Sequence, residues 1–125
     1  MIPVAEVHIG EKEKQYVNDC LETGWVSSLG KYVVAFEEAF ARFCGAAYGV
    51  ATNNGTTALH LALAGLRIGP GDEVIVPSLT FVATGNVVAY CGAKPVFVDI
   101  TRDTWTMDPA AVAAAITPRT RAIIP

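Results

Sequence analysis

The chain has 125 residues, of which 52% are hydrophobic and 17% charged, and its formal net charge is −3. This composition is typical of a globular protein rather than of a disordered segment. The sequence has no basic cluster, no apolar run approaching the roughly 20 residues of a membrane span, and no basic-then-apolar start. We therefore expect a cytoplasmic protein that binds neither nucleic acid nor a membrane.

The cysteines argue against a metal or disulfide scaffold. Cys20, Cys44 and Cys91 are odd in number and widely spaced, and no CxxC pair occurs. We expect no metal site and no disulfide framework. Each cysteine lies in an apolar helical context, which favours a buried free thiol.

The first 45 residues indicate helices without a strand. An amphipathic pattern predicts a helix over 11–23, and phenylalanines at helical spacing predict a second over 31–44. A loop bounded by glycines, residues 24–31, lies between them. We therefore separate an N-terminal helical segment with its loop, 1–45, from the remainder, 46–125.

In the remainder, short apolar runs alternate with helical patterns. The expected strands and helices, in chain order, are 48–51, 56–67, 74–76, 81–91, 95–98, 108–116 and 122–124. This alternation predicts an α/β domain with a mainly parallel sheet and helices on both faces. The helix over 56–67 is apolar almost all round, so we expect it to be buried. No helix follows the last expected strand to cover it, and we expect the chain to be the first part of a longer protein.

The turn into the helix over 56–67 is the most informative stretch. Small and polar residues between a strand and a helix leave backbone N–H groups pointing outward at the positive end of the helix dipole, which favours an anion such as phosphate. Gly55 allows a ligand to approach the main chain, and Thr56 and Thr57 add hydroxyl groups. Asn54 is expected to shape the turn. From these residues alone, an ordinary N-cap on a buried helix is equally compatible.

Several blocks of sequence follow one another in a recognisable order. They are Gly-Trp-Val-Ser-Ser at 24–28, Phe-Glu at 36–37, Asn-Gly-Thr-Thr-Ala-Leu-His at 54–60, and the longer blocks 69–84, 93–99 and 116–120. With these blocks the chain resembles the DegT/DnrJ/EryC1/StrS family of PLP-dependent sugar aminotransferases. The resemblance covers nearly the whole chain.

The resemblance implies a fold type I, aspartate-aminotransferase-like fold, and residues 46–125 would be the first part of its large PLP-binding domain. It also implies a homodimer, pyridoxal 5'-phosphate as the cofactor, and amino transfer from L-glutamate to a keto carbon of a nucleotide-linked sugar. In the family, the turn before the first buried helix holds the PLP phosphate, so Gly55, Thr56 and Thr57 are the implied cradle.

The resemblance also assigns aromatic and loop residues. Phe81 follows the strand over 74–76, where ligands of open α/β sheets bind, and family members carry an aromatic residue there that stacks on the PLP ring. Packing in the core is the alternative for Phe81. Trp25, Ser27 and Ser28 lie on a loop that is close to the active site in relatives, which implies substrate contact. A dimer-contact or packing role for this loop is equally compatible.

Other polar residues are interpreted as structural. We expect a buried, hydrogen-bonded histidine at His60 and a turn cap at Asp99. Asp72 and Glu73 are expected to be solvated charges of a turn. Arg119 is expected to stay in solvent, with pairing to a substrate carboxylate or phosphate as the alternative.

No catalytic residue is expected within the chain. In the family, the Schiff-base lysine and the acidic partner of the pyridine nitrogen lie downstream, and none of the four lysines here occupies that position. The 125 residues alone are therefore predicted to be inactive, and to aggregate or stay partly unfolded. Two alternatives remain, a PLP-dependent deoxysugar dehydratase of the same family and a non-catalytic remnant. A Rossmann dinucleotide site is disfavoured because no GxGxxG follows the first expected strand.

Overall fold

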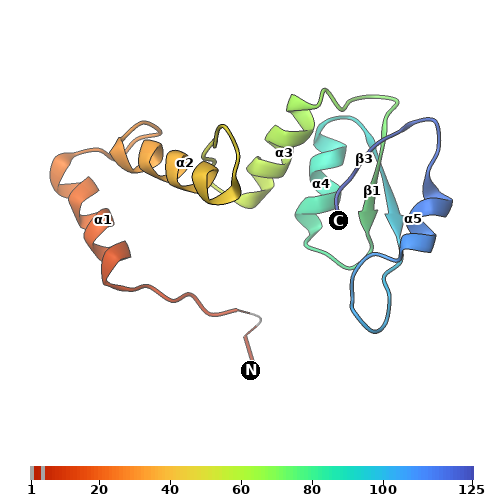
Figure 1. Cartoon of the computed structure of the whole chain (residues 1–125), viewed down its shortest axis with the longest axis horizontal. Helices are drawn as coiled ribbons and strands as arrows, with labels where there is room; N and C mark the ends of the chain where they lie inside the picture. Colours follow the sequence, from red (N-terminus) through yellow and green to blue (C-terminus); the bar gives the residue numbers. More distant parts are fainter. Residues whose placement is uncertain (1, 4) are drawn as a thin grey trace. The chain divides into compact units, whose positions relative to one another are not determined.

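The computed structural model describes residues 2–3 and 5–125, which form two compact units, Met1–Ala51 and Thr52–Pro125 (Figure 1). We call them the N-terminal unit and the C-terminal unit. The boundary lies at 51/52, a few residues later than the division at 45/46 expected from the sequence.

The N-terminal unit contains two helices, α1 (Glu11–Thr23) and α2 (Lys31–Cys44), as the sequence predicted. The carboxylate of Glu13 accepts the N–H of Gly10 at 2.8 Å, which satisfies a donor that the start of α1 would leave unpaired. Gly24 and Gly45 follow the two helices with φ of 73° and 66°, a left-handed conformation that glycine adopts without steric cost.

An ion pair and a pair of tyrosine rings join α1 to α2. Lys31 Nζ lies 2.6 Å from Asp19 Oδ2, and the rings of Tyr16 and Tyr32 are 4.7 Å apart between centroids. The hydrogen bond from Lys31 holds the pKa of Asp19 below its ordinary value. Among the described residues of this unit, Ala41 is the only hydrophobic residue that is buried. The ion pair and the tyrosine rings therefore hold α1 beside α2, but the two helices bury almost no hydrophobic residues between them.

The C-terminal unit is a three-stranded parallel sheet in the order β2-β1-β3. The strands are β1 (Glu73–Pro77), β2 (Lys94–Val98) and β3 (Thr120–Ile123), and the helices are α3 (Gly55–Gly65), α4 (Val82–Tyr90) and α5 (Pro109–Ala115). Ile75 at the centre of β1 pairs with Val96 on one side and Ile123 on the other. The predicted parallel sheet is confirmed.

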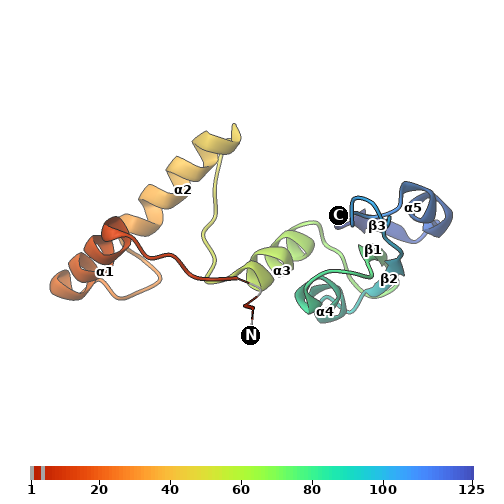
Figure 2. The same cartoon turned by 90° about the horizontal axis from the view of Figure 1, so that it is seen from below.

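The core of this unit lies between β1 and α4. Val74, Val76, Val87 and Val88 are fully buried in this core. Ile75 is also fully buried, but it points to the opposite face of the sheet. Helix α4 packs on β1 and β2, α5 packs on β2, and α3 packs against α4. Figures 1 and 2 show α4 and α5 on opposite sides of the sheet, which confirms the expected α/β layering.

Two structural expectations were wrong. Residues 48–51 form no strand and lie outside the described sheet, because none of the described strands is aligned with them. Helix α3 is not buried all round: Leu63 is 3% exposed, but Leu61 and Leu66 are 49% and 65% exposed. In the C-terminal unit it packs on α4, which covers the side that carries Leu63.

Of the three cysteines, which are free thiols in this structure, Cys44 is exposed and Cys20 and Cys91 are half-buried. The expectation of buried thiols was wrong for Cys44 because it ends α2 on a side that no described residue covers. None of the described helices combines the length and the apolar character that a membrane crossing requires.

Candidate functional site

The N-terminus of α3 is closed by side chains from its own loop. Asn54 is the N-cap, and its Oδ1 accepts the backbone N–H of Thr57 at 2.9 Å. The hydroxyl of Thr57 lies 2.6 Å from Asn53 Oδ1 and 2.8 Å from Asn54 Oδ1. Both polar groups of Thr57 are thus already engaged inside the loop, and Asn54 shapes the turn as expected.

Two backbone N–H groups at the N-terminus of α3 have no such partner among the described residues. Within the described chain, no acceptor is bonded to the backbone N–H groups of Gly55 and Thr56, and the helical ladder begins with Ala58 on the carbonyl of Asn54. A Cβ added at Gly55 would meet no atom within 4 Å. The packing of the chain therefore does not require glycine at position 55. A glycine here would, however, allow a ligand to approach the main chain closely. Two N–H groups at a helix N-terminus form a site suited to an anion.

Phe81 lies at the start of α4 and is 83% exposed. Packing in the core, the alternative reading of this residue, is therefore excluded in the described structure. An open groove of about 420 Å³ lies beside the ring, lined among others by Ser78, Thr80, Asn86 and Phe97. An aromatic face at the edge of a groove is available to stack on a planar ligand.

The residues implied for the cofactor lie at one end of the C-terminal unit. In Figure 1, α3 and α4 run in the same general direction and opposite to β1, so both helices begin toward the carboxyl end of that strand. Gly55, Thr56 and Thr57 open α3, and Phe81 precedes α4. Ligands of open α/β sheets bind outside the carboxyl ends of the strands.

The residues implied for substrate contact belong to the N-terminal unit. Trp25 and Ser27 line a small cavity of about 80 Å³ between α1 and α2, together with Leu29 and Tyr32, and Ser28 is exposed nearby in sequence. Trp25 is 57% exposed. A substrate role for Trp25, Ser27 and Ser28 stays a prediction.

Glu73 was misread as a solvated charge. Its side chain is 3% exposed and accepts the Thr117 hydroxyl at 2.7 Å and Arg119 Nη2 at 2.8 Å, with Lys94 Nζ at 3.4 Å. These donors, the Thr117 hydroxyl first, hold the pKa of Glu73 below its ordinary value. Arg119 stays largely in solvent, as expected, with its side chain 66% exposed, and it pairs with Glu73 from there.

The register of the sheet explains this cluster. Glu73 begins β1 and is aligned with Lys94 on β2 and Thr120 on β3. The cluster thus lies at the amino end of the strands, opposite to the end at which Phe81 follows β1. We assign it to holding the three strands together.

Asp72 is a turn residue, but its Oδ2 accepts the N–H of Gly69 at 2.9 Å. Asp99 accepts the following N–H of Ile100 at 2.8 Å and so caps the turn, as expected.

His60 is half-buried and lies edge-on to Tyr90, with ring centroids 5.9 Å apart. No hydrogen bond of its ring occurs within the described chain, so the expected buried, hydrogen-bonded histidine was wrong. Among the described residues, no group of three or more metal-ligating side chains is placed to hold an ion.

Comparison with known proteins decides the family. The model of the DegT/DnrJ/EryC1/StrS aminotransferase family matches residues 7–125. The chain belongs to this family. It is 55% identical to the GDP-perosamine synthase of Caulobacter vibrioides over 124 residues, which are 99% of this chain and 33% of that protein. It is 48% identical to the spore coat polysaccharide biosynthesis protein SpsC of Bacillus subtilis, over 99% of this chain and 32% of that protein.

Solved structures of aminotransferases share the fold. The sugar aminotransferase Spr1654 from Streptococcus pneumoniae in its PLP form superposes with a TM-score of 0.90 and is 40% identical, over 99% of this chain and 31% of that one. This likeness identifies the fold as that of the N-terminal part of PLP-dependent aminotransferases. The chain spans about a third of the length of the curated relatives it matches.

The described residues fit the phosphate and ring of PLP. The two unpartnered N–H groups of Gly55 and Thr56 match a phosphate, which carries only acceptors at neutral pH. The exposed ring of Phe81, near the same end of the sheet, matches the flat pyridine ring.

Proposed function

We propose that this chain is the N-terminal part of a PLP-dependent aminotransferase that moves an amino group from L-glutamate to a keto carbon of a nucleotide-linked deoxysugar. The observation that carries the proposal is the pair of free N–H groups at Gly55 and Thr56, in a member of a sugar aminotransferase family. When bound, PLP supplies the electron sink for the transfer. The protein supplies binding, orientation and electrostatics.

Each predicted residue has a separate role in this proposal. The N–H groups of Gly55 and Thr56 hold the phosphate, and the Thr56 hydroxyl adds a third donor. Thr57 belongs to the cradle by holding the turn in shape through its bonds to Asn53 and Asn54. Phe81 stacks on the pyridine ring, and Trp25, Ser27 and Ser28 contact the sugar nucleotide.

The substrate that we propose is GDP-4-keto-6-deoxymannose, which transamination converts to GDP-perosamine for a surface polysaccharide. The support is the description of the relative from Caulobacter vibrioides as GDP-perosamine synthase. The 48% identity to SpsC, which has a different description, makes the choice of sugar the point to test. That the enzyme is a cytoplasmic homodimer stays a prediction.

The test is an assay of the full natural chain with PLP, L-glutamate and either the GDP-linked or a dTDP-linked 4-keto-6-deoxysugar. The proposal predicts 2-oxoglutarate and aminosugar in equal amounts with the GDP-linked substrate. Amino transfer to the dTDP-linked sugar alone would overturn the substrate and keep the reaction. Loss of a hydroxyl group from a sugar that gains no nitrogen, with the nitrogen of glutamate released as ammonia, would identify the dehydratase. Absence of PLP binding would identify a remnant.

The stacking role of Phe81 is tested by Phe81→Leu in the same protein. Loss of the aromatic ring is expected to weaken PLP binding about three- to tenfold, the range of an aromatic contact. Because the ring is 83% exposed, the melting temperature without PLP should not fall. The matched control is Phe43→Leu, which changes another exposed phenylalanine, on α2, and should leave PLP affinity unchanged. Equal affinity of Phe81→Leu and wild type would remove Phe81 from the site.

A further inference from the structure

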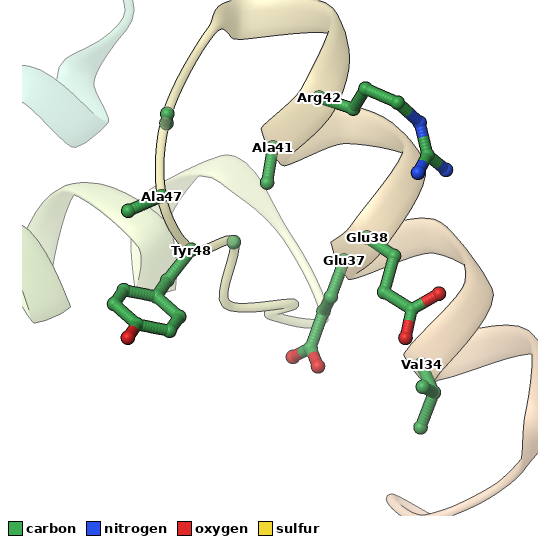
Figure 3. Close-up of a pocket in the computed structure, with 9 residues that line it drawn as sticks. Val34, Glu37, Glu38, Ala41, Arg42, Ala47 and Tyr48 are labelled. Atoms are coloured by element: carbon green, nitrogen blue, oxygen red, sulfur yellow. The ribbon is translucent and has the colours of Figure 1, made fainter.

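The chain turns back along α2 before it reaches the cofactor loop. After Gly45, the N–H of Ala46 bonds to the carbonyl of Ala41 at 2.9 Å, which reverses the direction of the chain. Residues 46–49 then form one wall of an open groove of about 530 Å³, and α2 forms the other wall. Figure 3 shows Ala47 and Tyr48 on this returning segment, alongside the helix that carries Glu37 and Ala41. We call residues 46–51 the return segment.

Two independent contacts fix the return segment at Glu37. The carboxylate oxygen Oε1 of Glu37 accepts the backbone N–H of Ala51 at 2.8 Å. A Cβ added at Gly49 would lie 2.6 Å from the backbone oxygen of Glu37 and 3.3 Å from its Cα. Only glycine therefore allows the segment to pass this close to α2. The return segment thus contacts α2 at Glu37 in two ways, through the Glu37 side chain at Ala51 and along the Glu37 backbone at Gly49.

The carboxylate of Glu37 takes the place of the backbone carbonyl to which the N–H of Ala51 would be bonded in a strand. Residues 48–51 were expected to be a strand, and an N–H in a strand is bonded to its neighbour. Within the described chain, the N–H of Ala51 has Glu37 as its acceptor. A bond from a backbone N–H to an ionised carboxylate is among the stronger hydrogen bonds in proteins.

Ala51 immediately precedes the proposed cofactor site. It is separated from Asn54, the cap of α3, by two residues, and from Gly55 by three. Even a fully extended chain spans only ~14 Å over four residue steps, so the position of Ala51 limits where the loop begins. We propose that Glu37 is a positioning residue for the cofactor loop: it fixes Ala51 and thereby the path of residues 52–56. This inference rests on the proposed function of that loop.

The neighbouring Glu38 provides a matched control. Figure 3 shows Glu37 and Glu38 on adjacent positions of α2, both beside the groove. The side chain of Glu38 is exposed and makes no hydrogen bond or ion pair within the described chain. Removal of either carboxylate changes the net charge equally, but only Glu37 is half-buried and bonded to Ala51.

The first measurement is amide hydrogen exchange of the full natural chain without cofactor. Glu37→Leu removes the acceptor and is expected to speed exchange of Ala51 by about tenfold, the worth of one hydrogen bond. It should also speed exchange of Thr57, whose N–H is bonded to Asn54 within the loop. Glu37→Gln keeps an acceptor and should stay close to wild type, and Glu38→Leu should change neither amide. Faster exchange confined to Ala51, or none, would overturn the proposal.

The second measurement is the dissociation constant of PLP for the same proteins, well below their melting temperatures. Glu37→Leu should weaken PLP binding at least threefold, with substantial recovery in Glu37→Gln and no change in Glu38→Leu. Gly49→Ala, which pushes the return segment from α2 and leaves Glu37 intact, should weaken binding in the same direction. Unchanged PLP affinity in Glu37→Leu, with a lowered melting temperature, would reduce Glu37 to a stabilising residue and overturn the proposal.

The two measurements separate this inference from the proposed function. If the wild-type protein bound no PLP, the proposed function would fail. The exchange measurement needs no cofactor and would still decide whether Glu37 controls the path of residues 52–56.

Discussion

The two units of this chain use apolar residues in opposite ways. In the C-terminal unit, β1 carries three consecutive residues, Val74, Ile75 and Val76, with no exposed surface. In the N-terminal unit, the rings of Phe36, Phe40 and Phe43 follow one another along α2 and are 55%, 53% and 87% exposed. The C-terminal unit has a core of its own. The helices of the N-terminal unit have an apolar side that no described residue covers.

This difference separates helix formation from stability. Helices α1 and α2 end at left-handed glycines and follow an amphipathic pattern, so local sequence is sufficient to place them. Most of the stability of a helix in a protein, however, comes from packing its apolar face. We therefore expect the energetics of the described chain to be concentrated in β1, α4 and their neighbours. Three changes of decreasing expected effect test this comparison in the full natural chain.

The largest effect is expected in the C-terminal unit. Ile75→Ala removes buried atoms at the centre of β1 and should lower the free energy of unfolding by about 2–5 kcal/mol. Phe43→Ala removes a larger side chain, but one that is 87% exposed, and should cost less than about 0.5 kcal/mol. Denaturant unfolding of both variants measures the difference. A cost for Phe43→Ala as large as that for Ile75→Ala would show that another part of the protein covers α2.

A middle effect is expected at the start of α3. Asn54→Ala removes the acceptor of the Thr57 N–H and should cost about 1 kcal/mol of stability. The control is Asn53→Ala, which loses an acceptor of the Thr57 hydroxyl but leaves the N–H bond in place. Denaturant unfolding of the two variants should rank Asn54→Ala as the more costly. The reverse order would mean that the hydroxyl contact, and not the N-cap, holds the loop.

The smallest effect is expected at Glu73, and it depends on pH. Its pKa is lowered in the folded protein, so its stabilising contribution is complete above the ordinary pKa of a glutamate, ~4.3, and is lost as pH falls through the lower folded value. The contribution is limited because Arg119 and Lys94 are 66% and 70% exposed and remain hydrated.

The Glu73→Gln variant isolates this pH dependence. Melting temperatures of wild type and Glu73→Gln should differ at neutral pH, and the difference should shrink as pH falls from about 4 through the lowered pKa of folded Glu73. A difference that stayed constant until the proteins unfold in acid would mean that the charge of Glu73 contributes nothing and that its hydrogen-bonding shape is what matters.

Local patterns predicted most elements of this fold. The short apolar runs that became β1, β2 and β3 carry their signals in a few adjacent residues, as does the start of the helix expected over 108–116, where Asp108 and Pro109 stand. Asp108 indeed caps α5, with its side chain accepting the N–H of Ala110 at 2.8 Å. The small and polar residues before the helix over 56–67 indicated an anion site at Gly55 from the sequence itself, whereas the stacking role of Phe81 came from the resemblance to a family.

The errors lie where the decisive partner is distant in sequence. Glu73 follows the turn residue Asp72, so local pattern assigns it to solvent, but the parallel register brings it to Lys94, Thr117 and Arg119. Residues 48–51 are apolar enough for a strand, yet a strand also needs an aligned neighbour, which an apolar run does not report. The role of Glu37 could not be predicted from the sequence. Its carboxylate accepts the N–H of Ala51, fourteen residues further along the chain, and such a bond leaves no periodic pattern.

The central claim, that this chain holds the phosphate of PLP at the start of α3, is tested most directly by amide NMR of the full natural chain during titration with PLP. The account predicts that the N–H resonances of Gly55 and Thr56 show the largest shifts, while Gly71, which lies in the turn before β1, stays unchanged. PLP binding that shifts other amides and leaves Gly55 and Thr56 unmoved would contradict it.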